Sequence, residues 1–354
     1  MSQRLYLFIG MLLGILITTS CNKEEEEATD GWQPGNQAIA FAVDADESFL
    51  PHAPHASRTT RGATSTTSSM TDFRVSAYYS STSATIGTSS LPNYMYNQQV
   101  TRPNSTSSWT YSPLKYWPQA GTLQFFAYSP YAATGVLSAE TAPGYPTLTY
   151  TVPTEVAQQQ DLLVTDITSP LSDKKPVTLT FSHALSCMEF HAKLSKQATQ
   201  GVVTKISEIQ ITGLKSTATY SSGPTKVWSV STTSATDSYI LTPTNYSLIA
   251  TDLTTTSQTL SSSTGLLMPI PQSIDDTSKI IVSTVTIANG AVTNASKEVA
   301  LNTIITTPLA PATKYKITIT VTPTDPSTST GGSITISYVC VDWKPETITI
   351  PPFN

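Results

Sequence analysis

Cys21 is the residue whose surroundings most clearly predict a chemical modification. An apolar segment at residues 5–17 precedes it, behind Arg4, and Lys23 with four glutamates follows it. The segment is shorter than the ~20 residues of a membrane-spanning helix, and its order of positive, apolar and small residues is typical of a signal peptide. We therefore expect residues 1–20 to be removed. The Cys21 thiol would then carry acyl chains that anchor a lipoprotein, since each buried methylene contributes about 0.8 kcal/mol.

The residues just before Cys21 leave one alternative open. Ser20 is small, as lipoprotein processing requires, whereas Thr18 stands where Leu is usual. An ordinary secretory signal that is cleaved nearby would instead leave Cys21 as a free thiol.

The other side chains that could act in catalysis or bind a metal are few and scattered. Of the four histidines, His52 and His55 lie in a Pro-rich stretch, and His183 sits in an apolar run that favours a hydrogen-bonded core imidazole. His191 and Glu189 share one face of a strand-like run and predict a surface pair. No nucleophile motif or phosphate-binding glycine loop accompanies them. We therefore predict no catalytic residue, no metal site and no cofactor, and we do not expect an enzyme.

The composition excludes a further class of function. The chain has 354 residues, a net charge of −5 and only 12% charged residues, without the basic excess that nucleic-acid binding needs. Its length suits two domains. Cys187 and Cys340 remain once Cys21 is assigned to lipid, and two cysteines are too few to cross-link a fold of this size. We favour buried, unpaired thiols, and a disulfide between Cys187 and Cys340 remains the alternative.

The apolar pattern predicts an all-β protein. Short runs rich in Val, Ile, Thr, Tyr and Phe recur between clusters of Pro, Gly, Asn and Ser, as in β-sandwiches. Residues 46–69 have no apolar period and predict a long exposed loop. We expect strands at residues 39–43, 73–79, 122–128, 148–152, 162–167, 177–181, 188–194, 205–211, 227–231, 266–270, 279–287, 315–321, 334–343 and 347–350.

A charged turn at residues 172–176 predicts the boundary between two domains. The alternation of apolar residues changes phase between Leu185 and Met188, which predicts a β-bulge within one strand. The expected organisation is a signal peptide at 1–20, a tether and leading strand at 21–61, an N-terminal domain at 62–172 and a C-terminal domain at 173–354.

Several spaced motifs resemble the fimbrillin family, the two-domain subunits of type V pili in Bacteroidia. They are the strand at 39–43 followed by Thr60-Arg61-Gly62-Ala63 and the strand at 73–79, Lys115-Tyr116-Trp117-Pro118, Phe125-Phe126-Ala127-Tyr128, Phe181-Ser182-His183-Ala184-Leu185, Leu267-Met268-Pro269-Ile270-Pro271-Gln272 and Val341-Asp342-Trp343. Each motif is weak by itself, but together they span nearly the whole mature chain in order. The resemblance implies two tandem transthyretin-like β-sandwich domains of mostly antiparallel strands.

The resemblance also implies a maturation step. An Arg-specific protease would cut after Arg61, with Arg58 as the alternative, and the strand that carries Ile39, Phe41 and Val43 would leave. A groove would open, and a neighbouring pilus subunit would fill it with a donor strand. The other reading of these arginines is a surface loop that stays uncut.

The C-terminus departs from the family pattern, because only eleven residues follow Trp343. Ile348 and Ile350 alternate as in a short donor strand, but Pro351 and Pro352 cannot donate ladder hydrogen bonds. A closing edge strand of the second domain is the favoured alternative. The chain would then be a tip, accessory or anchor subunit of the fimbrium.

The resemblance to the fimbrillin family also implies where the protein acts and what it binds. We expect export as a surface-exposed lipoprotein of the outer membrane, followed by a place in the fimbrium and a contribution to adhesion to a host or bacterial surface protein or glycan. The competing function is a non-polymerising adhesin or glycan-binding lipoprotein that uses exposed aromatic residues. Its candidates are Tyr94, Tyr96, Trp109, Tyr111, Tyr116 and Trp117.

Overall fold

The computed structural model describes residues 34–43, 69–130, 136–263, 265–323, 333–343 and 346–347, and these residues form β-strands with two short helical turns. The expected all-β fold is confirmed. Most strand pairs are antiparallel, and the described exceptions are the parallel pairs β2–β10 and β11–β19. The helical turns are η1 (Val156–Gln158) and α1 (Leu301–Ile304).

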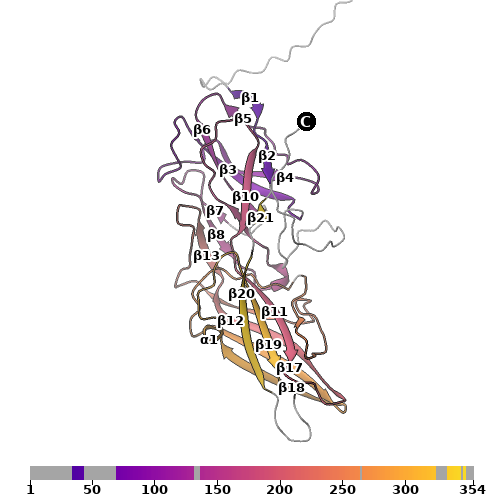
Figure 1. Ribbon diagram of the computed structural model, residues 1–354. Helices are drawn as coiled ribbons and strands as arrows, with labels where there is room; N and C mark the ends of the chain where they lie inside the picture. The colour runs from indigo at the N-terminus through magenta and orange to yellow at the C-terminus, as the bar shows by residue number, and fades with distance from the viewer. Residues whose placement is uncertain are drawn as a thin grey trace, which may run out of the picture.

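The first sheet lies at one end of an elongated molecule (Figure 1). Its spatial order is β2 (Phe41–Val43), β10 (Val177–His183), β9 (Leu163–Thr165), β6 (Thr122–Ser129), β3 (Asp72–Ser80) and β4 (Met95–Thr101), and β21 (Glu346–Thr347) also pairs with β10. Next to this sheet, β1 (Pro34–Ala38) pairs with β5 (Tyr116–Pro118).

One face of this sheet forms the first hydrophobic core. Phe73, Val75 and Ala77 share a face of β3, as their alternation predicts, and all three are buried. They belong to one cluster with Phe125 of β6, Trp117 of β5 and residues that precede the expected loop. The core at this end is therefore closed partly by the start of the chain.

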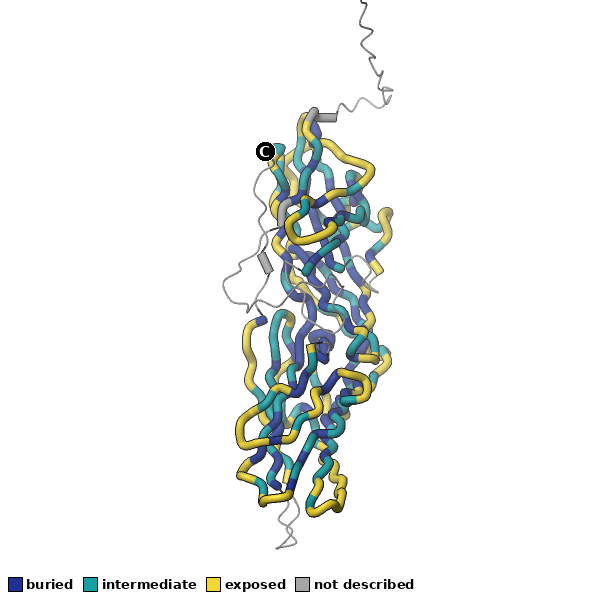
Figure 2. The backbone as a smooth tube through the Cα atoms, turned by 90° about the vertical axis from the view of Figure 1, so that its right-hand side faces the viewer, coloured by how far each residue is buried: buried dark blue, intermediate teal, exposed yellow. Residues whose placement is uncertain are grey.

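The remaining strands form three sheets around a larger core. One sheet holds β14 (Val227–Ser229), β13 (Thr217–Ser221), β8 (Thr147–Thr151) and β7 (Val136–Leu137); the next holds β16 (Gln258–Thr259), β11 (Cys187–Leu194), β19 (Thr313–Val321) and β20 (Ile334–Asp342). The last holds β15 (Thr236–Leu241), β12 (Val202–Lys215), β17 (Lys279–Ala288) and β18 (Ala291–Ala300). A single buried cluster joins these sheets to the second face of the first sheet, and Figure 2 shows buried residues along the length of the molecule.

The strand pairing crosses the expected domain boundary at residue 172. β10 follows that boundary in the sequence but pairs with β9 in the first sheet, and β13 pairs with β8. The chain enters the second half only after His183, because β11 begins at Cys187 in another sheet. The predicted bulge between Leu185 and Met188 is therefore wrong, since the change of phase marks a crossover between sheets. The division into domains at 172 stays a prediction.

Two further expectations need correction. The expected strand at 266–270 makes only an isolated bridge, Met188 to Leu267. Both Cys187 and Cys340 are free, but only Cys187 is buried, so the expectation of burial is wrong for Cys340. Cys340 lies near the end of β20, an edge strand whose last residues are exposed. Among the residues described, no helix has the length and apolar character needed to cross a membrane.

Gly213 marks a bulge that the packing of β12 requires. The register between β12 and β15 shifts between Thr212 and Leu214, and Gly213 has φ of +82°. A Cβ atom at Gly213 would lie 2.8 Å from both Ser278 Cα and Thr277 O. Only glycine satisfies both the positive φ and the close approach.

We expect Gly213→Ala to lower the free energy of unfolding by about 2–4 kcal/mol, because strain and steric overlap add. Gly290→Ala is the matched control, since Gly290 has the same φ of +82° with no heavy atom near its Cβ position. It should cost only about 1–2 kcal/mol. Urea unfolding of both variants measures the difference, and equal losses would show that the contact with Ser278 is unimportant.

Candidate functional site

The segment at residues 34–43 bridges two elements of the first sandwich. β1 pairs with β5 through Ala38 and Tyr116, and β2 then runs parallel to β10. In the second pairing, Phe41 lies opposite Val177. A strand from the very start of the described chain therefore forms an edge of the first sheet (Figure 1).

Two apolar side chains fix this segment in the core. Ile39 and Phe41 are 1% and 2% exposed. The Phe41 ring meets Phe73, Tyr111 and Phe125 edge-on, with centroids 5.8, 5.5 and 5.9 Å away. Burial of each side chain contributes roughly 1.5–3 kcal/mol, and each aromatic pair adds about 0.5–1.5 kcal/mol.

Backbone hydrogen bonds hold the same segment from both sides. Ile39 N–H donates to Lys115 O at 2.8 Å, and Tyr111 Oη donates to Ile39 O at 2.9 Å. On the β10 side, Val177 N–H donates to Ala40 O at 2.8 Å. Burial raises the pKa of Tyr111, which keeps its hydroxyl a donor at neutral pH. The connection between β1 and β2 is therefore hydrogen-bonded on both sides.

The chain that follows the expected loop is held by a separate set of contacts. Arg102 is buried and donates from Nε to Met70 O at 2.9 Å, and its backbone N–H donates to Thr71 O. Its guanidinium lies 4.5 Å from the centroid of the Trp109 ring. Burial lowers the pKa of Arg102, but a guanidinium stays charged at neutral pH. The start of β3 is thus anchored without the 34–43 segment.

The C-terminal strand also reaches β10. Trp343 N–H donates to Ala312 O at 2.7 Å, and the Trp343 ring stacks on His183 with centroids 3.9 Å apart. His183 Nδ1 lies 3.0 Å from the buried Asp161 carboxylate, as expected for a hydrogen-bonded core imidazole. β21 then pairs with Thr180 and Phe181 of β10. β21 thus lies at an edge of β10, a strand that the sequence assigns to the second domain and that the structure places in the first sheet. The rest of the expected closing strand at 347–350 lies outside the described residues.

The structure brings together only part of the predicted site. Ile39 and Phe41 lie in the core, and Val43 pairs with Leu179. The other predicted positions lie outside the described residues: Cys21, Arg58, Arg61, Ile348 and Ile350. The pairing of β21 with β10 is the feature that sequence reasoning missed, because a two-residue strand carries no periodic signal.

The aromatic residues proposed to bind sugars are mostly structural. Trp109 and Trp117 are 6% and 1% exposed and pack in the first core, so neither can stack on a ligand. Tyr116 is exposed, but Trp117 next to it points inward. The expectation of a sugar platform that includes Trp109 and Trp117 is wrong, because their rings pack against Phe73 and Phe125 inside the first core.

A cavity of about 750 Å³ lies where the two halves of the chain meet. His183, Tyr220, Trp228 and Gln272 are among the residues that line it. Trp228 is held in place because its Nε1–H donates to Ala184 O at 2.7 Å. Trp228 is half-buried and lines this cavity, whereas Trp109 and Trp117 are buried in the first core. The cavity is therefore the better candidate for glycan binding.

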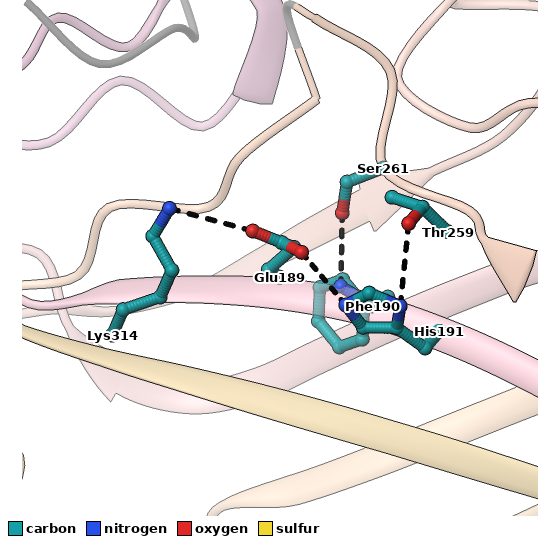
Figure 3. Close-up of polar contacts among 6 residues, drawn as sticks. All are labelled: Glu189, Phe190, His191, Thr259, Ser261 and Lys314. Atoms are coloured by element: carbon teal, nitrogen blue, oxygen red, sulfur yellow. Dashed lines mark hydrogen bonds and ion pairs between the residues drawn. The ribbon is translucent and has the colours of Figure 1, made fainter. Parts of the chain in front are cut away.

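A polar cluster lies on β11 (Figure 3). The Glu189 carboxylate accepts a hydrogen bond from His191 Nε2 at 2.7 Å and lies 3.4 Å from Lys314 Nζ. Burial alone would raise the pKa of Glu189, but Lys314 and His191 hold it below its usual value. This is the surface pair that the sequence predicts. Within the described ranges, no three His, Cys, Asp or Glu side chains gather as metal ligands.

Comparison with known proteins agrees with this architecture. A family model described as fimbrillin-like matches residues 57–338. A solved fimbrial protein from Bacteroides vulgatus is 19% identical, with a TM-score of 0.67 over 87% of this chain and 100% of that one. A candidate cell adhesion protein from Bacteroides uniformis is 15% identical, with a TM-score of 0.52 over 87% of this chain and 99% of that one. A search of curated proteins returned no significant match.

We expect Phe41→Ala to loosen the 34–43 segment from β10. Removing a buried Phe costs about 3–5 kcal/mol, so the Val177 amide should exchange hydrogen about a hundredfold faster or more. Gln37→Ala is the control, because Gln37 is exposed on the same segment. Hydrogen exchange followed by mass spectrometry measures both variants. Unchanged protection at Val177 in Phe41→Ala would show that other contacts hold β2.

We expect Glu189→Gln to lower the free energy of unfolding by about 1 kcal/mol at pH 7, because it removes the charge that faces Lys314 and His191. The folded-state pKa is depressed, so this contribution is complete above the ordinary value of 4.5 and is lost as pH falls below it. Urea unfolding at several pH values measures the difference. Glu298→Gln, in the exposed pair with Lys279, should change little at any pH, and a Glu189→Gln effect that persists at low pH would contradict the electrostatic cause.

Proposed function

The chain belongs to the fimbrillin-like family, and from this premise we propose that it is a structural subunit of a type V fimbrium that contributes to adhesion. In this proposal it is exported as an outer-membrane lipoprotein on Cys21, is matured by an Arg-specific protease and assembles by donor-strand exchange. It acts through strand pairing and has no catalytic role.

The observation that carries the proposal is the place of the 34–43 segment. Its Ile39 and Phe41 are buried, it supplies the edge strand on β10, and it precedes the stretch that contains Arg58 and Arg61. A cut after Arg61 would turn the segment into a separate peptide that is held only by noncovalent contacts. Its departure would be resisted by the burial of Ile39 and Phe41 and by their hydrogen bonds.

Loss of the segment would create an acceptor for another strand. The backbone groups of β10 that now face Ala40 would lose their partners, and the apolar space around Phe73 and Phe125 would open. An unpaired edge beside an apolar groove favours the addition of a strand from another chain. A neighbouring subunit would supply that strand, with apolar side chains at alternate positions.

The rest of the first domain has contacts of its own that do not depend on the leading segment. Cleavage after Arg61 leaves residues 62–68 ahead of Ser69, and Arg102 holds Met70 and Thr71 in place. β3 also pairs with both β4 and β6. The mature N-terminal domain proposed at 62–172 therefore keeps its central strands when the leading segment leaves.

The same cut decides how the subunit is attached. Cys21 and the strand with Ile39, Phe41 and Val43 lie on one side of Arg61. Cleavage releases the lipid together with that strand, so the anchor serves during export and moves the subunit from the outer membrane to the fimbrium. If the chain stays intact, the lipid stays joined to the sandwich, as an anchor subunit requires. In this proposal the subunit takes a tip, accessory or anchor position, and Ile348 and Ile350 are its candidate donor residues.

Cleavage and assembly can be tested together. After treatment with an Arg-specific protease, we expect N-terminal sequencing to find a chain that begins at Gly62, and SDS-resistant oligomers to form. Arg61→Lys keeps the charge but removes the cleavage residue, and it should block both events. Arg58→Lys is the matched control and should leave both unchanged. If treated protein still begins at Cys21, the maturation step is wrong.

The glycan-binding alternative predicts a different outcome from the same preparations. If the protein is a non-polymerising adhesin, the Arg61→Lys variant and the parent chain should bind a glycan array equally well. Neither should form oligomers after protease treatment. Trp228, which lines the cavity between the two halves, is then the aromatic residue to substitute.

A further inference from the structure

The cavity where the two halves meet has the size of a small-molecule site. Its volume of about 750 Å³ lies within the roughly 300–1,000 Å³ that is usual for ligand pockets. Its walls come from the end of β10, from β13 and β14, and from the loops that contain Gln272 and Leu309. These elements belong to different sheets and are far apart in the sequence, so the pocket exists only in the folded chain.

Two deeply buried side chains present free polar atoms to this cavity. His183 and Tyr220 are 3% and 4% exposed, and both line it. Among the described residues, neither His183 Nε2 nor Tyr220 Oη has a hydrogen-bond partner. Both atoms remain accessible, in contrast to Trp109 Nε1, Trp117 Nε1 and Tyr239 Oη, which are unpartnered and sealed in the interior. An accessible atom on a side chain so deeply buried therefore faces the cavity that the side chain lines.

Neighbouring groups set the chemistry of these two atoms. The Asp161 carboxylate lies 3.0 Å from His183 Nδ1 and can only accept, so the proton of a neutral imidazole sits on Nδ1 and Nε2 is left as an acceptor. The Trp343 ring stacks on the same imidazole and fixes its plane. Burial, and then the charge of Asp166, raise the pKa of Tyr220 to about 12, so its hydroxyl stays protonated and can donate.

Trp228 adds an aromatic surface of fixed orientation. Its Nε1–H donates to Ala184 O at 2.7 Å, so the only polar group of the indole is already satisfied. The ring lies 5.5 Å from the Tyr220 ring, centroid to centroid, and is half-buried. Only apolar ring surface is left for a ligand. An apolar platform beside one acceptor and one donor suits a molecule with a C–H face and a rim of hydroxyl groups, as in a pyranose sugar.

The charged groups around the cavity favour a neutral ligand. The described lining residues include two lysines and two aspartates. Lys226 forms an ion pair with Asp166, Lys215 Nζ donates to two backbone carbonyls, and Asp275 accepts hydrogen bonds from the residues just after it. Each of the four therefore has a partner within the protein. A charged ligand would have to displace one of these partners, whereas a neutral polyol would not.

We propose that this cavity binds a neutral mono- or disaccharide, with one sugar ring stacked on Trp228, one hydroxyl donating to His183 Nε2 and another accepting from Tyr220 Oη. The site goes beyond the strand-pairing role proposed above and does not depend on it. The cavity lies at the His183 end of β10, whereas β2 pairs with Val177–Leu179 at the other end. A subunit can therefore bind the sugar with or without its leading segment.

Saturation-transfer difference NMR on the uncut chain tests the site. The probes are neutral mono- and disaccharides built from hexoses and N-acetylhexosamines, with glucuronic-acid disaccharides as the charged comparison. We expect at least one neutral probe to bind saturably at millimolar concentration or below, and more tightly than the charged probes. If no neutral probe binds, or if only the acidic sugars do, the inference is overturned.

Variants then place the bound sugar in the cavity. Tyr220→Phe removes only the hydroxyl and should weaken binding of the neutral probe about three- to tenfold. Trp228→Ala should weaken it at least about tenfold, because it removes the platform. Tyr239→Phe is the matched control: it also removes a buried, unpartnered hydroxyl, but Tyr239 is not among the residues that line the cavity, and binding should not change.

The conservative variant keeps the test decisive. Trp228→Ala also removes the hydrogen bond to Ala184 O, so its folding is checked by circular dichroism, and Tyr220→Phe decides the outcome if that variant unfolds. Binding that is equal in Tyr220→Phe and in the parent chain would overturn the inference. Because the chain is uncut, failure of cleavage at Arg61 would leave these measurements unchanged. Loss of sugar binding would likewise leave the formation of SDS-resistant oligomers unchanged, so the two proposals fail separately.

Discussion

The parallel pairing of β2 with β10 is the contact on which the first sandwich depends. While Phe41 lies opposite Val177, β2 covers the edge of β10. The Phe41 ring also closes the core, because it packs against both Phe73 and Phe125. Parallel strands need a long connection, and here the partners are far apart in the sequence. The pairing therefore joins the start of the chain to its middle, and one cut in the intervening sequence would convert a permanent edge strand into a dissociable ligand.

Covalent attachment explains how a short segment can be stable and still replaceable. Two buried apolar side chains and a few hydrogen bonds give a binding free energy of several kcal/mol at most. While the segment is tethered, its effective concentration at the groove is in the millimolar range, which raises its occupancy far above that of a free peptide at low concentration. A free peptide at low concentration loses that advantage. In the proposed exchange, a strand presented by a neighbouring subunit would regain it, so the exchange would be driven by tethering rather than by stronger contacts.

The parts of the fold that follow a simple rule could be predicted from the sequence. β3 is predicted correctly because Phe73, Val75 and Ala77 alternate along it, and β6 because its apolar and aromatic run is buried on both faces. β18 was not anticipated, because nearly all of Ala291–Ala300 is exposed and no apolar period survives. Trp343 stacks on His183 and β21 pairs with β10, and both contacts join residues so far apart in the sequence that no local pattern predicts them. The burial of Trp109 and Trp117 could not be predicted either, since the sequence alone does not distinguish an aromatic residue that packs in a core from one that is exposed for binding.

An acceptor strand must keep its shape when its ligand leaves, and β10 has the supports for this. Its far edge is hydrogen-bonded to β9, and its last residue, His183, is fixed by Asp161 and by the Trp343 ring. Just beyond, Ser186 N–H donates to Pro269 O in the second half. None of these contacts involves the 34–43 segment. The junction of the two halves therefore holds β10 in register from one end, and this is the rigidity that the proposed strand exchange would require of the acceptor.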